Sequence, residues 1–305
     1  MKLSDSKHHF NAILHFALYV SLAFCPAINT KAQLQIQQML SSDKGLSSTL
    51  IGDIVQDKNG NLWIATENGL NRYNGVKLIN YYHDESNPHS LSSNYVRDIF
   101  EDKDGNLFIG TYAGIQLYDP ATDSFSVAAT YESGELFYNL INHFIQRQNG
   151  DILASGNMLG KVTIAADGHP VVSYLDIPIP TASIEEVFED SKGRLWITKE
   201  ASGIFRLDPD NSVHNYCTEI GTDPFCICLK EDSKGNILAG TSKDGLLRYD
   251  PIADEFKPVG SEKFITRALL VNNEEETFIC TDGKGLKCFN NTTGEITDYH
   301  FEVGF

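Results

Sequence analysis

The chain has no excess of basic residues and, beyond residue 25, no long hydrophobic run. Its 305 residues include 24 Lys and Arg against 41 Asp and Glu, a formal net charge of −17. An acidic chain argues against nucleic acid as a partner and against direct docking on anionic lipid. Because no stretch after the leader could span a bilayer, we expect membrane attachment only through C-terminal regions that this chain lacks.

The motifs of common catalytic and phosphate sites are also missing. The sequence has no His-Glu-x-x-His, no Gly-x-Ser-x-Gly and no Gly-x-x-x-x-Gly-Lys-Ser/Thr. Gly283 and Gly285 lie between expected strands, with no helix to bind a phosphate. Asp102-Lys-Asp-Gly105 lacks the spacing and the distal Glu of a calcium loop, so we predict a hairpin turn. We therefore expect no catalytic residue, no cofactor and no metal site.

Residues 1–32 have the pattern of a signal peptide. Lys2 and Lys7 give a weakly basic start, Phe10 to Cys25 is mostly apolar, and small residues up to Ala32 offer a cleavage site. The apolar run is too short for a comfortable membrane span. We expect an exported, periplasmic protein whose mature part is residues 33–305.

The main feature that is present is an internal repeat. Asp57-Lys-Asn-Gly-Asn-Leu-Trp-Ile-Ala-Thr66 is matched by Asp102-Lys-Asp-Gly-Asn-Leu-Phe-Ile-Gly-Thr111. Six copies follow one another at intervals of 45, 45, 43, 42 and 40 residues, counted between Thr66, Thr111, Gly156, Lys199, Thr241 and Thr281. The units are about 46–90, 91–135, 136–180, 181–223, 224–263 and 264–303. A period of this size indicates a solenoid or a propeller.

Each unit predicts four strands. In the first unit these are residues 54–56, 62–66, 70–73 and 76–81, separated by turns rich in Gly, Asn and Asp. Four strands in a unit of this length form a propeller blade. We therefore predict an all-β fold, a partial β-propeller of four-stranded blades over residues 33–305. Six repeats of a seven-bladed ring are present, so the ring is expected to be incomplete, with residues 34–39 as an outer strand of its last blade.

The alternation of a meander divides the loops between two faces. The Asp-x-x-Gly turns are uniform on one face, whereas the loop after each second strand and the link before each first strand vary on the other. Variable loops on a rigid scaffold are where binding tends to occur. Aromatic and amide side chains there suit a polyhydroxylated ligand, and we predict as ligand-binding residues Glu67, Asn68, Asn94, Tyr95, Tyr112, Tyr138 and Lys243.

Other conspicuous residues favour a structural role. Trp63 and Trp196 share one register and are expected in the core. The cysteines after the leader are expected to be small buried hydrophobes rather than a disulfide or metal site. His143, His169 and His214 are isolated in weakly repeating regions and are expected at the surface.

Residues 91–111 and 46–73 resemble the two-component regulator propeller repeat, through Leu-Ser-Ser-x-x-Val/Ile ahead of Glu/Gln-Asp-x-x-Gly-x-Leu-Trp/Phe-Ile. The resemblance implies the periplasmic sensor of a hybrid two-component histidine kinase. Such receptors are anchored in the inner membrane and act as homodimers, and many sense glycan-derived oligosaccharides. This chain has no transmembrane, phosphoacceptor or receiver region, so we expect a non-catalytic sensor part, truncated before the kinase.

Two alternatives stay open. One is a propeller-fold carbohydrate-active enzyme, a lyase or glycosidase, which would need acid and base residues clustered on one face. The other is a free-standing interaction scaffold, which would require that six blades close the ring.

Overall fold

The computed structural model describes residues 40–179, 184–199, 203–216, 226–272 and 275–299. Residues 40–299 form one compact unit. The predicted signal peptide, the outer strand expected at residues 34–39 and Cys217 lie outside the described residues.

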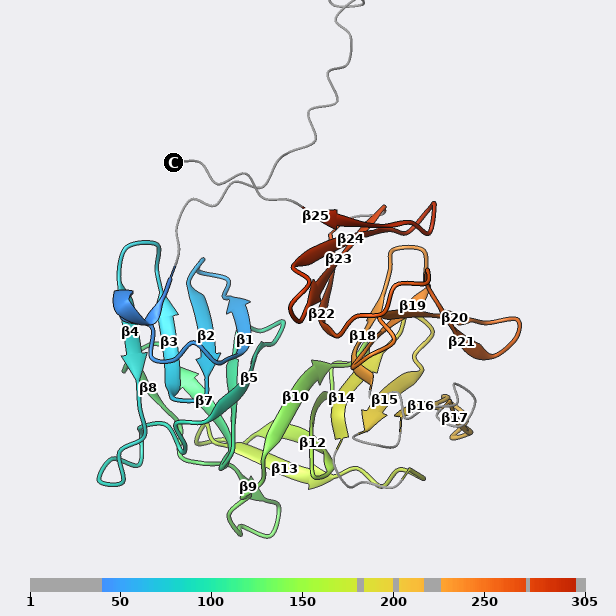
Figure 1. Ribbon diagram of the computed structural model, residues 1–305. Coiled ribbons are helices and arrows are strands. Elements are labelled where there is room, and N and C mark those ends of the chain that lie inside the picture. Colours follow the sequence, from blue (N-terminus) through green and yellow to red (C-terminus); the bar gives the residue numbers. More distant parts are fainter. Residues whose placement is uncertain (1–39, 180–183, 200–202, 217–225, 273–274, 300–305) are drawn as a thin grey trace, which may run out of the picture. The chain divides into compact units, whose positions relative to one another are not determined.

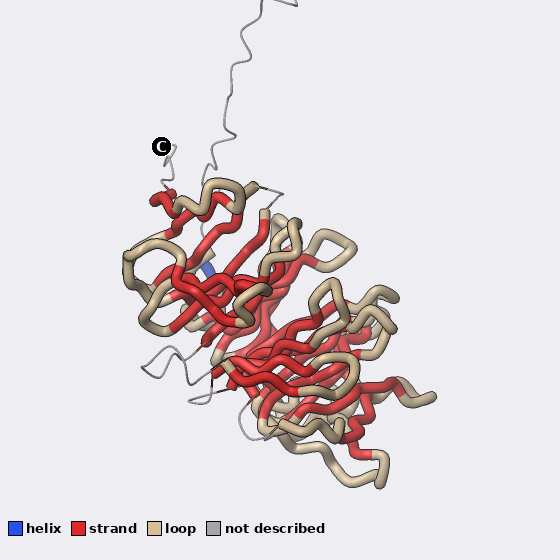
Figure 2. Tube along the Cα trace, turned by 90° about the vertical axis from the view of Figure 1, so that its right-hand side faces the viewer, coloured by secondary structure: helices blue, strands red, loops and turns tan. Residues whose placement is uncertain are grey.

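The described residues are almost entirely strands and loops, with one short 3-10 turn, η1 (Ser42–Lys44) (Figure 2). The strands form six sheets in the order of the chain (Figure 1). Sheet 1 is β1 (Ile51–Gln56), β2 (Leu62–Thr66), β3 (Gly69–Tyr73) and β4 (Leu78–Tyr81); sheet 2 is β5 (Val96–Glu101), β6 (Leu107–Thr111), β7 (Gly114–Asp119) and β8 (Ser124–Phe125). Sheet 3 is β10 (Ile141–Gln146), β11 (Ile152–Gly156), β12 (Leu159–Ile164), β13 (Pro170–Tyr174) and β9 (Thr130–Tyr131). Sheet 4 is β14 (Ile184–Glu189), β15 (Leu195–Lys199), β16 (Gly203–Leu207) and β17 (Val213–Asn215); sheet 5 is β18 (Cys226–Glu231), β19 (Ile237–Thr241), β20 (Leu246–Asp250) and β21 (Glu255–Pro258). Sheet 6 is β22 (Thr266–Val271), β23 (Glu276–Thr281), β24 (Leu286–Asn290) and β25 (Ile296–Tyr299).

This arrangement confirms the predicted all-β fold, a β-propeller in which six mostly four-stranded blades are present. Sheet 3 is the exception, because β9 pairs in parallel with the outer edge of β13. We expected residues 130–131 to belong to the second blade. Instead, the fourth strand of sheet 2 ends after two residues, at Phe125, and the chain then crosses to the neighbouring sheet.

The hydrophobic core is divided among the boundaries between successive sheets. Five clusters of buried side chains each join one sheet to the next. At the first boundary, for example, Trp63 and Leu70 of sheet 1 pack with Val96 and Ile99 of β5. Trp63 and Trp196 are fully buried, which confirms their predicted place in the core.

The second strand of three sheets has a small residue one position before its end, namely Ala65, Gly110 or Gly240, and the packing at these boundaries explains it. A Cβ atom added at Gly110 would lie 2.8 Å from side-chain atoms of Ile141 and Phe144 in the next sheet. At Gly240 it would lie 2.4 Å from Thr266 Cγ2. Because real Cβ atoms essentially never approach this closely, glycine allows the first strand of the next sheet to pack at both positions.

The expectation for the cysteines is only partly correct. Cys226 and Cys228 are buried in the first strand of sheet 5. Cys280 is exposed and Cys288 is half-buried. Sheet 6 contributes to the core cluster that it shares with sheet 5 through Leu269, Ile279 and Phe289, so its cysteines lie outside that cluster.

Candidate functional site

The Asp-x-x-Gly turns have a structural role. In the first turn, Asp57 Oδ1 accepts hydrogen bonds from the backbone N–H groups of Asn59 and Asn61, and Oδ2 accepts from Trp63 Nε1 at 2.8 Å. Asp190 is bonded in the same way to Trp196 Nε1, at 2.7 Å. The carboxylate therefore holds its own turn to the strand that follows, as the hairpin prediction requires.

The variable loops share the opposite face. Gly69 N–H, after the first variable loop, donates to Asn94 O at 2.6 Å, and Tyr112 N–H donates to Tyr95 O at 3.0 Å. Gly245 N–H likewise donates to Phe264 O. In sheets 1, 2 and 5 these bonds tie the loop after the second strand to the link before a first strand, so the two kinds of segment lie together there.

Two links on this face are longer than the others. Residues 82–95 join sheets 1 and 2, and residues 126–140 join sheets 2 and 3, whereas the links at 175–183 and 259–265 are shorter. The two long links border a cavity of about 370 Å³. Its lining includes buried Leu91, Ala113 and Phe137, exposed Val127, Leu136 and Tyr138, and polar His83, Asp84 and Glu85.

The buried amide of Gln116 fixes the base of this cavity. Its Oε1 accepts from Ser92 N–H at 2.6 Å, and its Nε2 donates to Ser90 O at 2.9 Å and to Ser126 O at 2.8 Å. One side chain that is 1% exposed therefore holds both long links. Because an amide without its partners is costly to bury, this arrangement favours a preformed cavity.

The polar end of the cavity is also held in place. His83 N–H donates to Asn94 Oδ1 at 2.7 Å, and His83 Nδ1 lies 2.5 Å from Leu91 O. An imidazole that donates from Nδ1 presents Nε2 as an acceptor when it is neutral. Hydrogen bonds from the hydroxyl and N–H of Ser86 hold the pKa of Asp84 below its usual value, so this carboxylate is ionised at neutral pH.

The structure distributes the seven predicted ligand-binding residues over several places. Tyr138, 69% exposed, lines the cavity, and Asn94 orients His83 from behind. Tyr95 and Tyr112 meet edge to face with ring centroids 6.4 Å apart, outside the lining. Glu67 and Asn68 are exposed beside sheet 1, and Lys243 is exposed beside sheet 5. Five residues that line the cavity were not predicted. The lengths of the two links could have indicated His83, Asp84, Glu85 and Leu136, whereas Gln116 lies in β7.

A second group of ionisable side chains lies along the first strands. Asp53, Asp98, His143 and Glu186 occupy the third position of four successive first strands, where each strand has a β-bulge. Asp98 Oδ1 lies 3.5 Å from His143 Nδ1, and Glu186 Oε1 lies 3.9 Å from His143 Nε2. The expectation that His143 is an isolated surface residue is therefore wrong, because the propeller brings strands 40 to 45 residues apart side by side.

The carboxylates of this row also accept backbone hydrogen bonds across the sheet boundaries. Asp53 accepts from Ile99 N–H, Asp98 from Phe144 N–H and Glu186 from Leu229 N–H, at 3.2, 2.7 and 2.8 Å. Burial, together with the charge of Asp98, raises the pKa of Asp53 to about 6. Burial opposes protonation of His143, but Asp98 and Glu186 outweigh it and raise its pKa.

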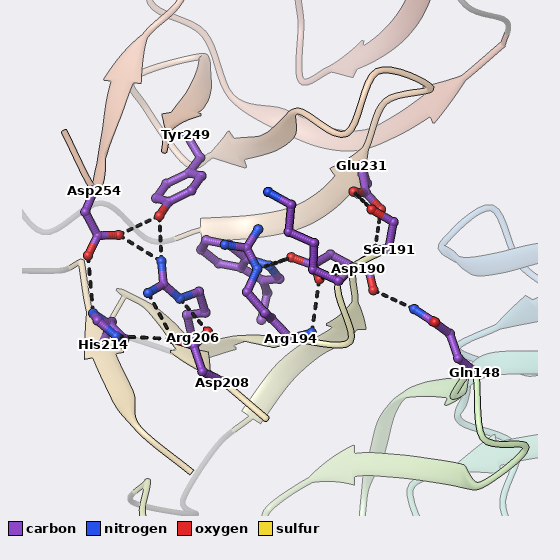
Figure 3. A network of polar contacts seen from close by, with 12 residues as sticks. Gln148, Asp190, Ser191, Arg194, Arg206, Asp208, His214, Glu231, Tyr249 and Asp254 are labelled. Carbon is purple, nitrogen blue, oxygen red and sulfur yellow. Dashed lines mark hydrogen bonds and ion pairs between the residues drawn. The ribbon is translucent and has the colours of Figure 1, made fainter. Parts of the chain in front are cut away.

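A denser polar network joins sheets 4 and 5 (Figure 3). Arg206 donates to Asp208 at 2.9 Å, to Asp254 at 2.8 Å and to Tyr249 Oη at 2.5 Å. His214 lies 3.3 Å from both carboxylates, so it is also not isolated at the surface. These polar groups are bonded to one another across the boundary, so we assign them a structural role in holding sheets 4 and 5 together.

Within the described ranges, no group of three or more His, Cys, Asp or Glu side chains is placed to hold a metal ion. No helix in the same residues has the length and apolar character needed to cross a membrane.

Two of the six repeats match a known family model. Residues 45–68 and 90–113 match the family described as two component regulator propeller. These two segments are similar to two component regulator propeller repeats. Within them, Leu46 and Leu91 are buried, and the serine that follows each bonds through its hydroxyl to Thr66 or Thr111 at 2.9 Å. These contacts explain why the repeat signature begins with Leu-Ser.

Solved structures similar to the chain include two extracellular domains from B. thetaiotaomicron. BT3049, described as a hybrid two component system, is 25% identical with a TM-score of 0.73, over 88% of this chain and 37% of that one. BT4673, described as a one component system, is 20% identical with a TM-score of 0.71, over 88% of this chain and 39% of that one. The chain thus spans well under half the length of these structures.

A lyase has the same fold. Virginiamycin B lyase from Staphylococcus aureus is 14% identical with a TM-score of 0.61, over 85% of this chain and 88% of that one. At this identity the likeness shows the fold alone. None of the curated proteins compared with the chain matches it.

Proposed function

We propose that the chain is a non-catalytic, exported sensor part of a hybrid two-component receptor, and that the cavity between its two long links binds the ligand. The observation that carries this proposal is the match to the extracellular domain of BT3049 over 88% of the chain. The regulator propeller repeats support it independently. In this proposal residues 1–32 direct export to the periplasm, and dimerisation and inner-membrane anchoring belong to the longer receptor.

The proposed ligand is an oligosaccharide fragment. A volume of about 370 Å³ falls in the lower part of the range typical of small-molecule sites, about 300–1,000 Å³. The exposed ring of Tyr138 offers an apolar face for stacking on a sugar ring, while His83 and Asp84 offer hydrogen-bond acceptors for hydroxyl groups.

Binding of the purified chain to an array of di- and trisaccharides tests this proposal. Tyr138→Ala should weaken binding about 5- to 10-fold because stacking on the ring is lost. Tyr174→Ala is the matched control, since Tyr174 is 65% exposed and lies outside the lining. Equal losses in the two variants, or no binding of any sugar by the wild type, would contradict the proposal.

We propose further that the ring is incomplete and that another blade covers β1 in the longer receptor. Ile51 and Ile54 are 41% and 56% exposed, whereas Val96 and Ile99 at the same positions of β5 are 1% and 3% exposed. Leu50, next to them, is 58% exposed. A row of apolar side chains at positions that are buried in other blades supports a missing neighbour.

A further inference from the structure

The charges around the cavity indicate which sugars it can bind. This inference rests on the proposed function. Asp84 and Glu85 stand side by side at its polar end. Among the described residues that line the cavity there is no Lys or Arg, so none of these side chains carries a permanent positive charge. We infer that the cavity selects neutral or amine-bearing sugars of about disaccharide size and rejects sugars that carry a carboxylate or sulfate.

The two acids differ in how firmly they are held. Asp84 is fixed by Ser86 and remains ionised at neutral pH. Its backbone N–H is bonded to Ser90 Oγ at 2.9 Å, and that hydroxyl donates in turn to Asp84 O at 3.0 Å. The carboxylate of Asp84 is therefore held in a fixed position by the folded link, and a ligand can bind next to it without a rearrangement of the link. Glu85 is exposed and follows directly in the chain.

An anionic sugar in this cavity would lack a fixed cation. Proteins commonly recognise a carboxylate or sulfate through Arg or Lys, which offer charge-assisted hydrogen bonds. Here the fixed charge is negative, so a uronate would be repelled. Hydroxyl groups can instead donate to Asp84 and to an acceptor nitrogen of His83, and an ammonium group would be attracted by the two acids.

The net charge of the whole chain also disfavours an anionic ligand. The chain carries a net charge of −17, so long-range attraction for an anion is also weak. The apolar side of the cavity, formed by Leu91, Val127, Leu136 and Phe137, supplies packing but no positive charge. Selection by charge would therefore be strongest at low ionic strength and would shrink as salt screens the two exposed acids.

The test is isothermal titration of the purified chain with matched sets of disaccharides. Each set holds a neutral sugar, its counterpart oxidised to a uronic acid at C6 and its 2-amino counterpart, as in cellobiose, cellobiouronic acid and the glucosamine dimer, and the sets cover several linkages. In the set that binds, we expect the uronic acid to bind about 10-fold more weakly than the neutral sugar at low salt, with the gap narrowing at high salt.

Two charge-reversal variants separate the local effect from the net charge. Glu85→Lys should strengthen binding of the uronic acid about 3- to 10-fold. Asp104→Lys makes the same change of net charge at an exposed turn on the opposite face and should leave binding unchanged. A uronic acid or sulfated sugar that binds as tightly as its neutral counterpart would overturn the inference and leave the proposed function standing. Failure of all sets to bind would overturn both.

Discussion

Asp98 Oδ1 lies 3.5 Å from His143 Nδ1, and Glu186 faces the other nitrogen of the same imidazole at 3.9 Å. The three side chains come from three successive sheets. Together with Asp53 they form an ionisable row that crosses the boundaries between blades, so the stability of the propeller should depend on pH.

The expected direction of this dependence follows from the raised pKa of Asp53. A carboxyl with a folded pKa of about 6, against an ordinary 3.8, holds its proton more tightly in the folded state. Its stabilising contribution is therefore present at low pH and is lost as pH rises from about 4 through about 6. The raised pKa of His143 acts in the same direction at higher pH.

Asp53→Asn should flatten this dependence. Between pH 4.5 and 7.5 we expect the variant to lose about 1–2 kcal/mol less unfolding free energy than the wild type, measured by urea denaturation. Asparagine keeps an acceptor for Ile99 N–H, so the backbone contact survives. Asp104→Asn, at an exposed turn, is the control, and identical slopes for the wild type and the Asp53 variant would refute the expectation.

Replacing the two buried tryptophans by phenylalanine should have unequal effects. Trp196→Phe leaves Asp190, whose side chain is 0% exposed, without one of its hydrogen bonds and should cost about 1–3 kcal/mol. Trp63→Phe should cost less, because Asp57 is more exposed. Thermal or urea unfolding of both variants measures the difference. A larger loss at Trp63 would show that packing rather than the hydrogen bond decides.

Arg206 should not tolerate lysine. The guanidinium is 8% exposed and bonds Asp208, Asp254 and Tyr249 together (Figure 3), and an ammonium group cannot reproduce that fork. We expect Arg206→Lys to lower the unfolding free energy by about 1–3 kcal/mol. Arg267→Lys is the matched control: Arg267 is 59% and its partner Asp282 49% exposed, so the expected change is below about 0.5 kcal/mol. Equal losses of unfolding free energy in the two variants would show that the Arg206 network does not stabilise the fold.

The proposed additional blade predicts a contrast between two equivalent isoleucines. Ile99→Ser removes a core side chain and should cost about 3 kcal/mol or more in urea unfolding. Ile54→Ser, at the exposed equivalent in β1, should be close to neutral in this chain. In the longer receptor Ile54→Ser should become destabilising. No change there would indicate that nothing packs on β1.

Much of the fold could be predicted from the sequence because the repeat is defined by local sequence features. Turn residues, the apolar second strand and the small residue at Gly110 recur at fixed spacing and need no knowledge of distant contacts. The parallel pairing of β9 with β13 could not be predicted this way, because two residues carry no strand pattern of their own.

The site was harder to predict for a related reason. The cavity depends on how two irregular links fold over Gln116, which is a tertiary arrangement. The ionisable row places Asp, His or Glu at the same position of successive first strands. Because the residue type changes from repeat to repeat, a comparison of the repeats does not identify the row. Only the packing of one sheet on the next shows that these side chains are neighbours. Tyr138 was predicted because exposed aromatics on a variable face are conspicuous. His83 and Glu85, which also line the cavity, were not predicted because the link resembles an ordinary polar loop.

The most direct test of the central claim is amide hydrogen exchange of the purified chain, with and without a saturating concentration of the disaccharide that binds most tightly in the matched sets. We predict slower exchange in residues 82–95 and 126–140 on binding, with the short link at residues 259–265 unchanged as an internal control. Protection confined to the Asp-x-x-Gly turns of the opposite face, or spread equally over all links, would contradict a ligand site between the two long links.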